Sequence, residues 1–99
     1  MRENTLQKKC IAHLKELGIY YNNNHGDSWG SRGTPDITAC IKGRYVAFEL
    51  KVGNNQLEPA QVLHKKRIEA NGGLHFEIRT LDEFVSTVRK LVEGKEITK

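Results

Sequence analysis

The chain has 99 residues, 37% of them hydrophobic and 28% charged, which is enough for one domain with one hydrophobic core and too few for two. No apolar run approaches the length of a membrane span and no signal-peptide pattern opens the chain, so we expect a soluble protein that stays in the cell that makes it. The net charge of +4, from 16 Lys and Arg against 12 Asp and Glu, suits a polyanionic partner, although the ordinary explanation is a solvated, mildly cationic surface.

The first predicted element is a helix over residues 3–17. Its apolar side chains recur at helical spacing and form one stripe, made of Leu6, Cys10, Leu14 and Leu17. Gly18 predicts the end of this helix, and the β-prone residues 19–21 predict a short strand.

Residues 22–35 read NNNHGDSWGSRGTP and contain almost no aliphatic side chain. Such a composition predicts a loop, and a loop of this length in a small domain is usually functional or mobile.

Residues 36–42 and 45–52 alternate between apolar and other side chains, and Lys42-Gly43-Arg44 lies between them. This pattern predicts a β-hairpin. The chain has 2 cysteines, Cys10 and Cys40, without any spacing typical of zinc ligands. Both fall inside predicted elements, so we expect buried, reduced thiols.

The second half of the chain predicts a helix, a strand and a helix. Pro59 suits the first turn of a helix that starts near Glu58 and stops at Gly72-Gly73. Residues 74–78 alternate as a strand, and residues 80–83 form a Thr-x-x-Glu capping box that opens a last helix, which ends at Gly94.

The predicted order of elements is therefore α-β-β-β-α-β-α. A hairpin followed by a strand–helix–strand crossover, which is normally parallel, predicts a mixed sheet of about four strands with helices on both faces. The fold class is α/β, in a single domain over residues 1–99.

The predicted register of the hairpin brings two carboxylates together. If Lys42-Gly43 forms the turn, Ile41 pairs with Arg44, and counting outward places Asp36 opposite Glu49. Opposed residues on one sheet face have Cβ atoms about 4.5–5.5 Å apart, so like charges there destabilise the sheet unless a cation lies between them. Mg²⁺ prefers such oxygen ligands, so we expect a divalent metal site here.

Lys51 follows Glu49 by two residues and therefore lies on the same face of the strand, roughly 6.8 Å away. An ammonium group there could position the attacking water or stabilise negative charge on a phosphate. Two carboxylates, a metal and a lysine suffice for phosphodiester hydrolysis. Glu-x-Lys is a common pattern, however, and on its own it fits an ordinary amphipathic strand that faces water.

The run Arg32-Gly33-Thr34-Pro35-Asp36, followed by Glu49-Leu50-Lys51 and by Gln61, resembles the PD-(D/E)xK nuclease superfamily and, within it, the VRR-NUC family. The resemblance covers most of the chain, and the motifs come in family order. The chain is similar to the small stand-alone members of the family, which occur in bacteriophages. It implies a restriction-endonuclease-like core and a Mg²⁺ or Mn²⁺ site.

The resemblance also implies roles for individual residues. Asp36, Glu49 and the backbone carbonyl of Leu50 would be metal ligands, and Lys51 the catalytic lysine. Gln61 would orient Lys51 or the water, although an exposed helix position explains it too. Glu3 would join the metal site directly or through water, or would simply favour the first turn of its helix.

A further set of residues is placed to touch nucleic acid. Arg32 suits a phosphate near the metal, and Ser31, Thr34 and Asn24 could add neutral phosphate contacts. Trp29 could stack on an exposed base or anchor its loop on the core, and His25 could act near the site or be only solvated. Lys65, Lys66 and Arg67 form a basic run that either contacts DNA or is a solvated helix face.

The sequence thus predicts a Mg²⁺- or Mn²⁺-dependent endonuclease selective for branched or flapped DNA, with Asp36, Glu49, Lys51 and Gln61 at its catalytic centre. A homodimer would place two sites on two strands, and a phage protein would act in the cytoplasm of a bacterial host. Two alternatives remain: a non-catalytic nucleic-acid-binding module, and a protein-interaction domain in which Glu49 and Lys51 form a surface ion pair.

Overall fold

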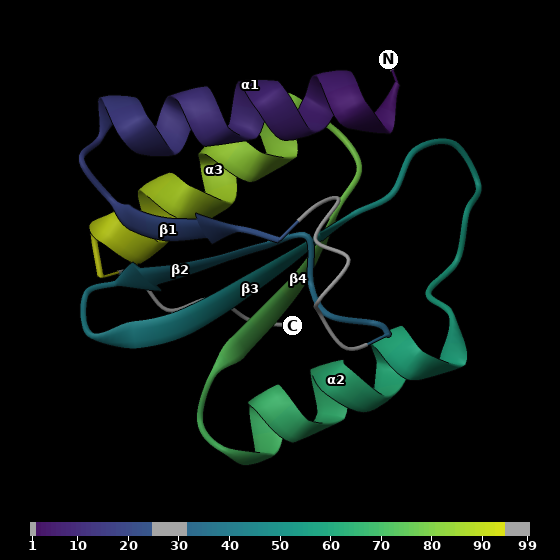
Figure 1. Ribbon diagram of the computed structural model, residues 1–99. Coiled ribbons are helices and arrows are strands. Elements are labelled where there is room, and N and C mark those ends of the chain that lie inside the picture. The colour runs from purple at the N-terminus through teal and green to yellow at the C-terminus, as the bar shows by residue number, and fades with distance from the viewer. Residues whose placement is uncertain (1, 25–31, 95–99) are drawn as a thin grey trace.

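A computed structural model describes residues 2–24 and 32–94 of the chain. Three helices flank one sheet of four strands (Figure 1). In chain order the elements are α1 (Glu3–Glu16), β1 (Tyr20–Asn23), β2 (Ile37–Ile41), β3 (Arg44–Leu50), α2 (Pro59–Ala70), β4 (Leu74–Ile78) and α3 (Leu81–Val92). This is the predicted order.

The strands lie in the order β1-β2-β3-β4. β1 and β3 pair with β2 in antiparallel fashion, while β4 pairs with β3 in parallel. Helices α1 and α3 pack together on one face of the sheet, and α2 lies on the other, against β4 (Figure 1). The predicted mixed α/β sheet with helices on both faces is confirmed.

The core lies between the sheet and the layer of α1 and α3. Alternate residues of β3 point into it, and Phe48 packs against Phe84 of α3 with ring centroids 4.7 Å apart. Leu6, Cys10 and Leu14 of α1 are buried there, as the predicted apolar stripe requires, whereas Leu17, the fourth predicted member, follows the end of α1 and is 49% exposed. Burying each large apolar side chain stabilises the fold by about 1.5–3 kcal/mol.

The opposite face of β3 is also buried near its end. Ala47 is 0% exposed and Glu49 is 2% exposed, so the amphipathic strand that faces water is the wrong interpretation of Glu-x-Lys. Burial on both faces is typical of strands in the middle of a sheet. The acid at position 49 is therefore held in a place that normally takes an apolar side chain.

Helix and strand ends follow local chemistry closely. Thr80 accepts a hydrogen bond of 3.1 Å from the Glu83 N–H, which confirms the capping residue of α3.

β1 extends further than predicted, because Asn22 and Asn23 pair with Thr38 and Ile37 across the sheet. Backbone pairing outweighs the low strand propensity of asparagine at these two positions.

The two cysteines differ, which corrects the expectation that both are buried. Cys10 is buried, and burial raises the pKa of its thiol to about 12. Cys40 is exposed. Its neighbours Ala39 and Ile41 point into the core, so alternation turns Cys40 to the opposite face, where α2 packs mainly against β4 at the far edge of the sheet.

Candidate active site

The register of the hairpin brings Asp36 and Glu49 together, as predicted. Ile41 pairs with Arg44 and Ile37 with Phe48, so Asp36 and Glu49 are the next opposed residues beyond the ladder. The carboxylate of Asp36 accepts a hydrogen bond of 2.8 Å from the backbone N–H of Leu50. This bond turns the Asp36 side chain toward the end of β3 that carries Glu49 and Lys51.

The backbone around Asp36 is fixed by two side chains from the start of the domain. Gln7 of α1 donates from Nε2 to the Asp36 carbonyl at 3.3 Å and to Asn23 Oδ1 at 2.7 Å. Asn24 donates its N–H to the same Asp36 carbonyl at 2.8 Å and its side-chain amide to the Pro35 carbonyl at 3.1 Å. The position of Asp36 therefore depends on contacts from α1 and from the end of β1, as well as on β3.

Glu49 is a buried acid whose neutral form the fold favours. Burial, followed by the negative charge of the adjacent Asp36 carboxylate, raises the pKa of Glu49 from 4.5 to about 9. Glu3 adds to this rise in pKa, while the positive charge of Lys51 opposes it. All three partners belong to the predicted site, so their charges act on one carboxyl group.

Gln61 holds one oxygen of Glu49 in place. Its Nε2 donates to Glu49 Oε1 at 3.0 Å, while its Oε1 accepts from the backbone N–H of Glu58 at 2.8 Å, just before α2. One amide thus supports the start of α2 and orients the buried acid. The resemblance implies that Gln61 orients Lys51 or the water; in the structure its amide contacts Glu49.

The residues present fit a divalent cation. Glu49 Oε2 is buried and has no hydrogen-bond partner among the described residues. A buried carboxylate oxygen without a partner is costly unless it is protonated or bound to a cation. A hard cation that takes one or two carboxylates together with phosphate oxygens suits Asp36 and Glu49.

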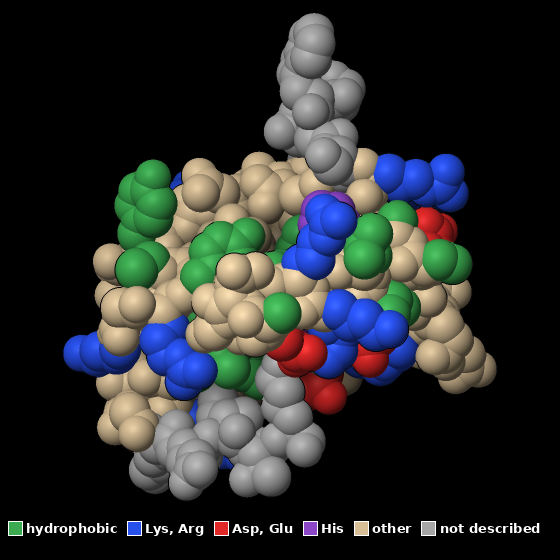
Figure 2. Space-filling view, turned by 90° about the horizontal axis from the view of Figure 1, so that it is seen from below, with side chains coloured by type: hydrophobic (Ala, Val, Ile, Leu, Met, Phe, Trp, Pro, Cys, Tyr) green, Lys and Arg blue, Asp and Glu red, His purple; other side chains and the backbone are tan. Residues whose placement is uncertain are grey.

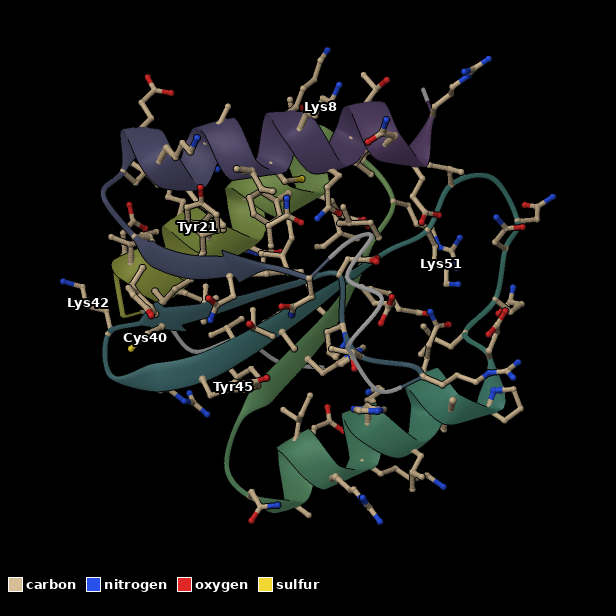
Figure 3. The ribbon with its side chains drawn as sticks, viewed as in Figure 1. Lys8, Tyr21, Cys40, Lys42, Tyr45 and Lys51 are labelled. Atoms are coloured by element: carbon tan, nitrogen blue, oxygen red, sulfur yellow. The ribbon has the colours of Figure 1, made fainter. Side chains whose placement is uncertain are left out.

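Lys51 and Glu3 approach the two acids from different elements. Lys51 follows β3, and its N–H donates to the Ile78 carbonyl at 3.0 Å. Figure 3 shows Lys51 at the end of the sheet opposite Lys42 and Cys40. Glu3, in the first turn of α1, is half-buried. Within residues 2–24 and 32–94, no three His, Cys, Asp or Glu side chains gather into a group that could hold a metal by themselves.

The turn before Asp36 packs tightly on the start of α2. Gly33 has a φ of 84°, and a Cβ built on it would lie 2.6 Å from the backbone carbonyl carbon and oxygen of Ala60. His64, one turn further along α2, contacts the Arg32 carbonyl through Nε2 at 3.1 Å. Because a carbonyl only accepts, Nε2 carries the proton in this contact. Glycine is therefore required at position 33 for α2 to approach.

The residues predicted to touch nucleic acid are distributed unevenly. Arg32 and Lys66 are exposed, and Thr34 is half-buried next to the site. Lys65 forms an ion pair of 3.2 Å with Glu69 on its own helix. Ser31, Trp29 and His25 lie outside the described residues.

Three positioning residues escaped sequence reasoning: Gln7, His64 and Arg79. The guanidinium of Arg79 donates to the carbonyls of Gly53 at 3.0 Å and Asn55 at 2.7 Å, which fixes the loop after Lys51. Gln7 and His64 lie one helical turn from Glu3 and Gln61 respectively, so helical spacing from a candidate site residue is the signal that could have found them.

Comparison with known proteins identifies the fold. No protein-family model matches the sequence, and no curated protein matches it. A solved structure described as a "VRR_NUC domain" superimposes with a TM-score of 0.73 at 20% identity, covering 88% of this chain and 94% of that one. A "VRR_NUC domain protein" superimposes with a TM-score of 0.80 at 16% identity, covering 99% of this chain and 93% of the other. The chain has the VRR_NUC fold.

The VRR_NUC fold confirms the architecture that the RGTPD and Glu-x-Lys resemblance implied. It extends over nearly the whole chain in both comparisons. None of the helices in the described part has the length and apolar character that crossing a membrane requires.

Proposed function

We propose that this chain is a divalent-metal-dependent nuclease that hydrolyses phosphodiester bonds of DNA. One observation carries the proposal: the buried Glu49 oxygen without a partner, beside Asp36 and within the electrostatic influence of Lys51. A buried carboxylate oxygen without a hydrogen-bond partner lowers stability, so such an arrangement is more typical of a binding or catalytic site than of a structural acid. The VRR_NUC fold of the neighbours described above supports the same assignment.

Asp36, Glu49 and the Leu50 carbonyl are the proposed ligands of Mg²⁺ or Mn²⁺. When bound, such a cation supplies Lewis acidity toward phosphate oxygens and makes an attacking water more acidic. Asp36 is held by the Leu50 N–H and Glu49 by Gln61, so both ligands are oriented before a cation arrives. Glu3 contributes negative charge from α1 and is a proposed further member of the site, directly or through water.

Lys51 is the proposed catalytic cation of the protein itself. Its ammonium stabilises negative charge as it grows on the scissile phosphate and holds the attacking water in line. Arg32, exposed on the turn held by His64, provides a second positive group for a neighbouring phosphate. Lys66 and Thr34 extend the proposed phosphate contacts, and Ser31 and Trp29 remain candidates of the same kind.

The proposed substrate is branched or flapped DNA, cut endonucleolytically, and a homodimer would supply two sites for two strands. Full-length protein should cut a four-way junction or a flap in Mn²⁺ and should not cut it in EDTA. Asp36→Asn should abolish cleavage, while Lys90→Ala on α3, in the opposite layer, should leave it unchanged. Mn²⁺ should also raise the melting temperature, because a ligand that binds only the folded state stabilises it.

A non-catalytic binding module is the alternative that this experiment separates. Such a module would bind the same DNA with no cleavage, and its melting temperature would not respond to Mn²⁺. Cleavage of plain duplex at the same rate as junctions would remove the structure selectivity while leaving the nuclease assignment intact.

A further inference from the structure

Part of the sheet face that carries Glu49 is exposed to solvent. Tyr20, Cys40 and Tyr45 are register partners across β1, β2 and β3, so their side chains share one face. Tyr20 is 73% exposed and Tyr45 is 51% exposed. Tyr45 and Glu49 lie on the same face of β3, four positions and roughly 13 Å apart. Two exposed aromatic rings therefore lie on the same sheet face as the proposed catalytic acid Glu49, from which the buried Ala47 separates them.

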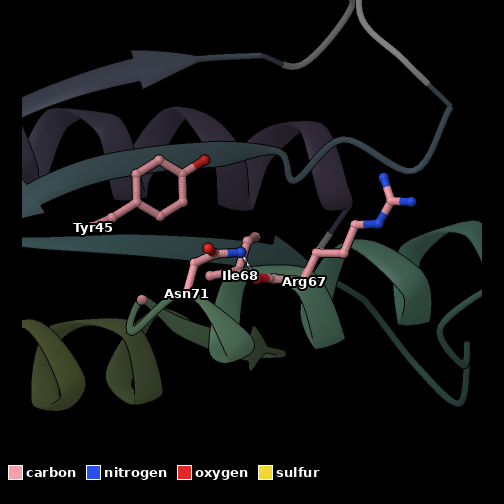
Figure 4. Close-up of a pocket in the computed structure, with 5 residues that line it drawn as sticks. Tyr45, Arg67, Ile68 and Asn71 are labelled. Atoms are coloured by element: carbon pink, nitrogen blue, oxygen red, sulfur yellow. Dashed lines mark hydrogen bonds between the residues drawn. The ribbon is translucent and has the colours of Figure 1, made fainter.

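Tyr45 stands between two hollows of this face. The larger, of about 270 Å³, separates it from the last turn of α2 and is lined by Tyr45, Arg67, Ile68, Asn71 and Gly73 (Figure 4). The smaller, of about 90 Å³, lies on the side of Tyr20 and Cys40. A Cβ at Gly73 would lie 2.8 Å from Ile68 Cγ2, so a side chain at position 73 would crowd the larger hollow.

The surroundings of this ring are basic. Arg67 lines the larger hollow and forms no ion pair with any described residue. Lys42, which is exposed, lies at the hairpin tip three residues before Tyr45. Figure 2 shows hydrophobic side chains beside Lys and Arg side chains on the face seen from below. Exposed rings with basic neighbours match the bases and phosphates of a single strand.

We propose that Tyr45 is a stacking platform for an unpaired nucleotide of the DNA substrate, with Arg67 contacting a phosphate beside it. The proposal rests on the proposed function and names its substrate class: DNA with a single-stranded segment near the cut. Inside a duplex the base faces are covered by their neighbours, so only an unpaired base can reach the ring. This gives selectivity for flaps and junctions a physical origin.

The test is binding of the full chain to a short fluorescent oligothymidylate in EDTA, followed by anisotropy. Tyr45→Ala should weaken binding by about 5- to 150-fold, and Tyr45→Phe should retain it, because stacking needs the ring and not the hydroxyl. Leu17→Ala is the matched control, since Leu17 is 49% exposed on α1, in the opposite layer. Arg67→Ala should weaken binding and reduce the slope of affinity against salt by about 1, whereas Arg89→Ala on α3 should not.

Three outcomes decide the proposal. Equal oligothymidylate affinity of wild type and Tyr45→Ala, in a protein that cuts DNA with Mn²⁺, would overturn the subsite and leave the nuclease intact. Loss of oligothymidylate binding in Tyr45→Ala, in a protein that cuts nothing, would support the subsite and reject the nuclease. A Tyr45→Ala protein that changes from dimer to monomer in sedimentation while still binding the oligonucleotide would make this face a contact between copies, which also overturns the subsite.

Discussion

The Gln61 amide lies 3.0 Å from one oxygen of Glu49, while the other oxygen of Glu49 is buried without a partner among the described residues. The carboxyl group is therefore held by one oxygen and available through the other. Buried acids without a second partner are uncommon in proteins, because the lost hydration is not replaced. A purely structural acid would have partners for both oxygens, whereas Glu49 is oriented through one oxygen and can bind a cation through the other. The first prediction depends on this arrangement.

The stability of the metal-free protein should fall as pH rises. The folded chain holds the pKa of Glu49 at about 9 against 4.5 in its ordinary environment, so between these values the unfolded chain has lost a proton that the folded chain keeps. The contribution of Glu49 is complete below pH 4.5 and is lost as pH rises through 9. Thermal melts in EDTA across this range measure it.

The control for this pH dependence is Glu49→Gln, which keeps the shape and cannot ionise. The variant should lose the Glu49 part of the pH dependence and, at pH 8, should have a higher free energy of unfolding than wild type, because no proton is lost from position 49 on unfolding. It should also lose the Mn²⁺-induced rise in melting temperature. If the pH profile of Glu49→Gln overlays that of wild type, a group other than Glu49 causes the pH dependence of stability.

Lys51→Ala should separate catalysis from folding. Removing a charge-stabilising donor typically slows a reaction by about 10²- to 10³-fold, and we expect that loss in the cleavage rate. The Mn²⁺-induced rise in melting temperature should remain, since Lys51 is not a proposed ligand. Lys90→Ala, an exposed lysine on α3, is the matched control for charge, and rates measured at saturating DNA separate catalysis from DNA binding. Undiminished cleavage by Lys51→Ala would remove Lys51 from the mechanism.

Gly33→Ala should damage both stability and activity. Any non-glycine residue is strained at a φ of 84°, and the added Cβ would also meet Ala60 at 2.6 Å. Gly18→Ala, at a φ of 69° with nothing within 4 Å, carries the backbone strain without the clash. We expect Gly33→Ala to lower the free energy of unfolding by about 1–3 kcal/mol more than Gly18→Ala does. Equal losses in urea titrations would show that the contact with α2 is dispensable.

Gln61→Ala should weaken cation binding through its effect on Glu49. Partners that orient a metal ligand typically contribute about 10- to 100-fold in affinity. Isothermal titration with Mn²⁺ measures the change, and the loss of the bond to Glu58 should lower stability by about 1 kcal/mol as well. His64→Ala is the neighbouring control, because it releases Arg32 and leaves Glu49 untouched. An unchanged Mn²⁺ affinity in Gln61→Ala would limit Gln61 to supporting the helix.

The sequence by itself determined the order of elements, the register of the hairpin and the pairing of Asp36 with Glu49. These features depend on local periodicity and on one tight turn, which act between residues close in the chain. Asp36, Glu49 and Lys51 could be named for the same reason, whereas Gln61 was named from the resemblance to the VRR-NUC family. Burial could not be predicted in this way. The alternation of β3 by itself fits an amphipathic strand with Glu49 and Ala47 facing water, and the position of Cys40 inside a strand suggested a buried thiol.

Only the tertiary structure decided which faces are covered and which groups support the site. Gln7, His64 and Arg79 act on segments 29, 32 and 24–26 residues away in the chain, so no local pattern reports their contacts. The raised pKa of Glu49 likewise requires dehydration by packed neighbours. Because α2 packs against β4, it leaves Tyr45 open at one end of β3 while Glu49 is buried at the other, and no pattern within β3 sets that division.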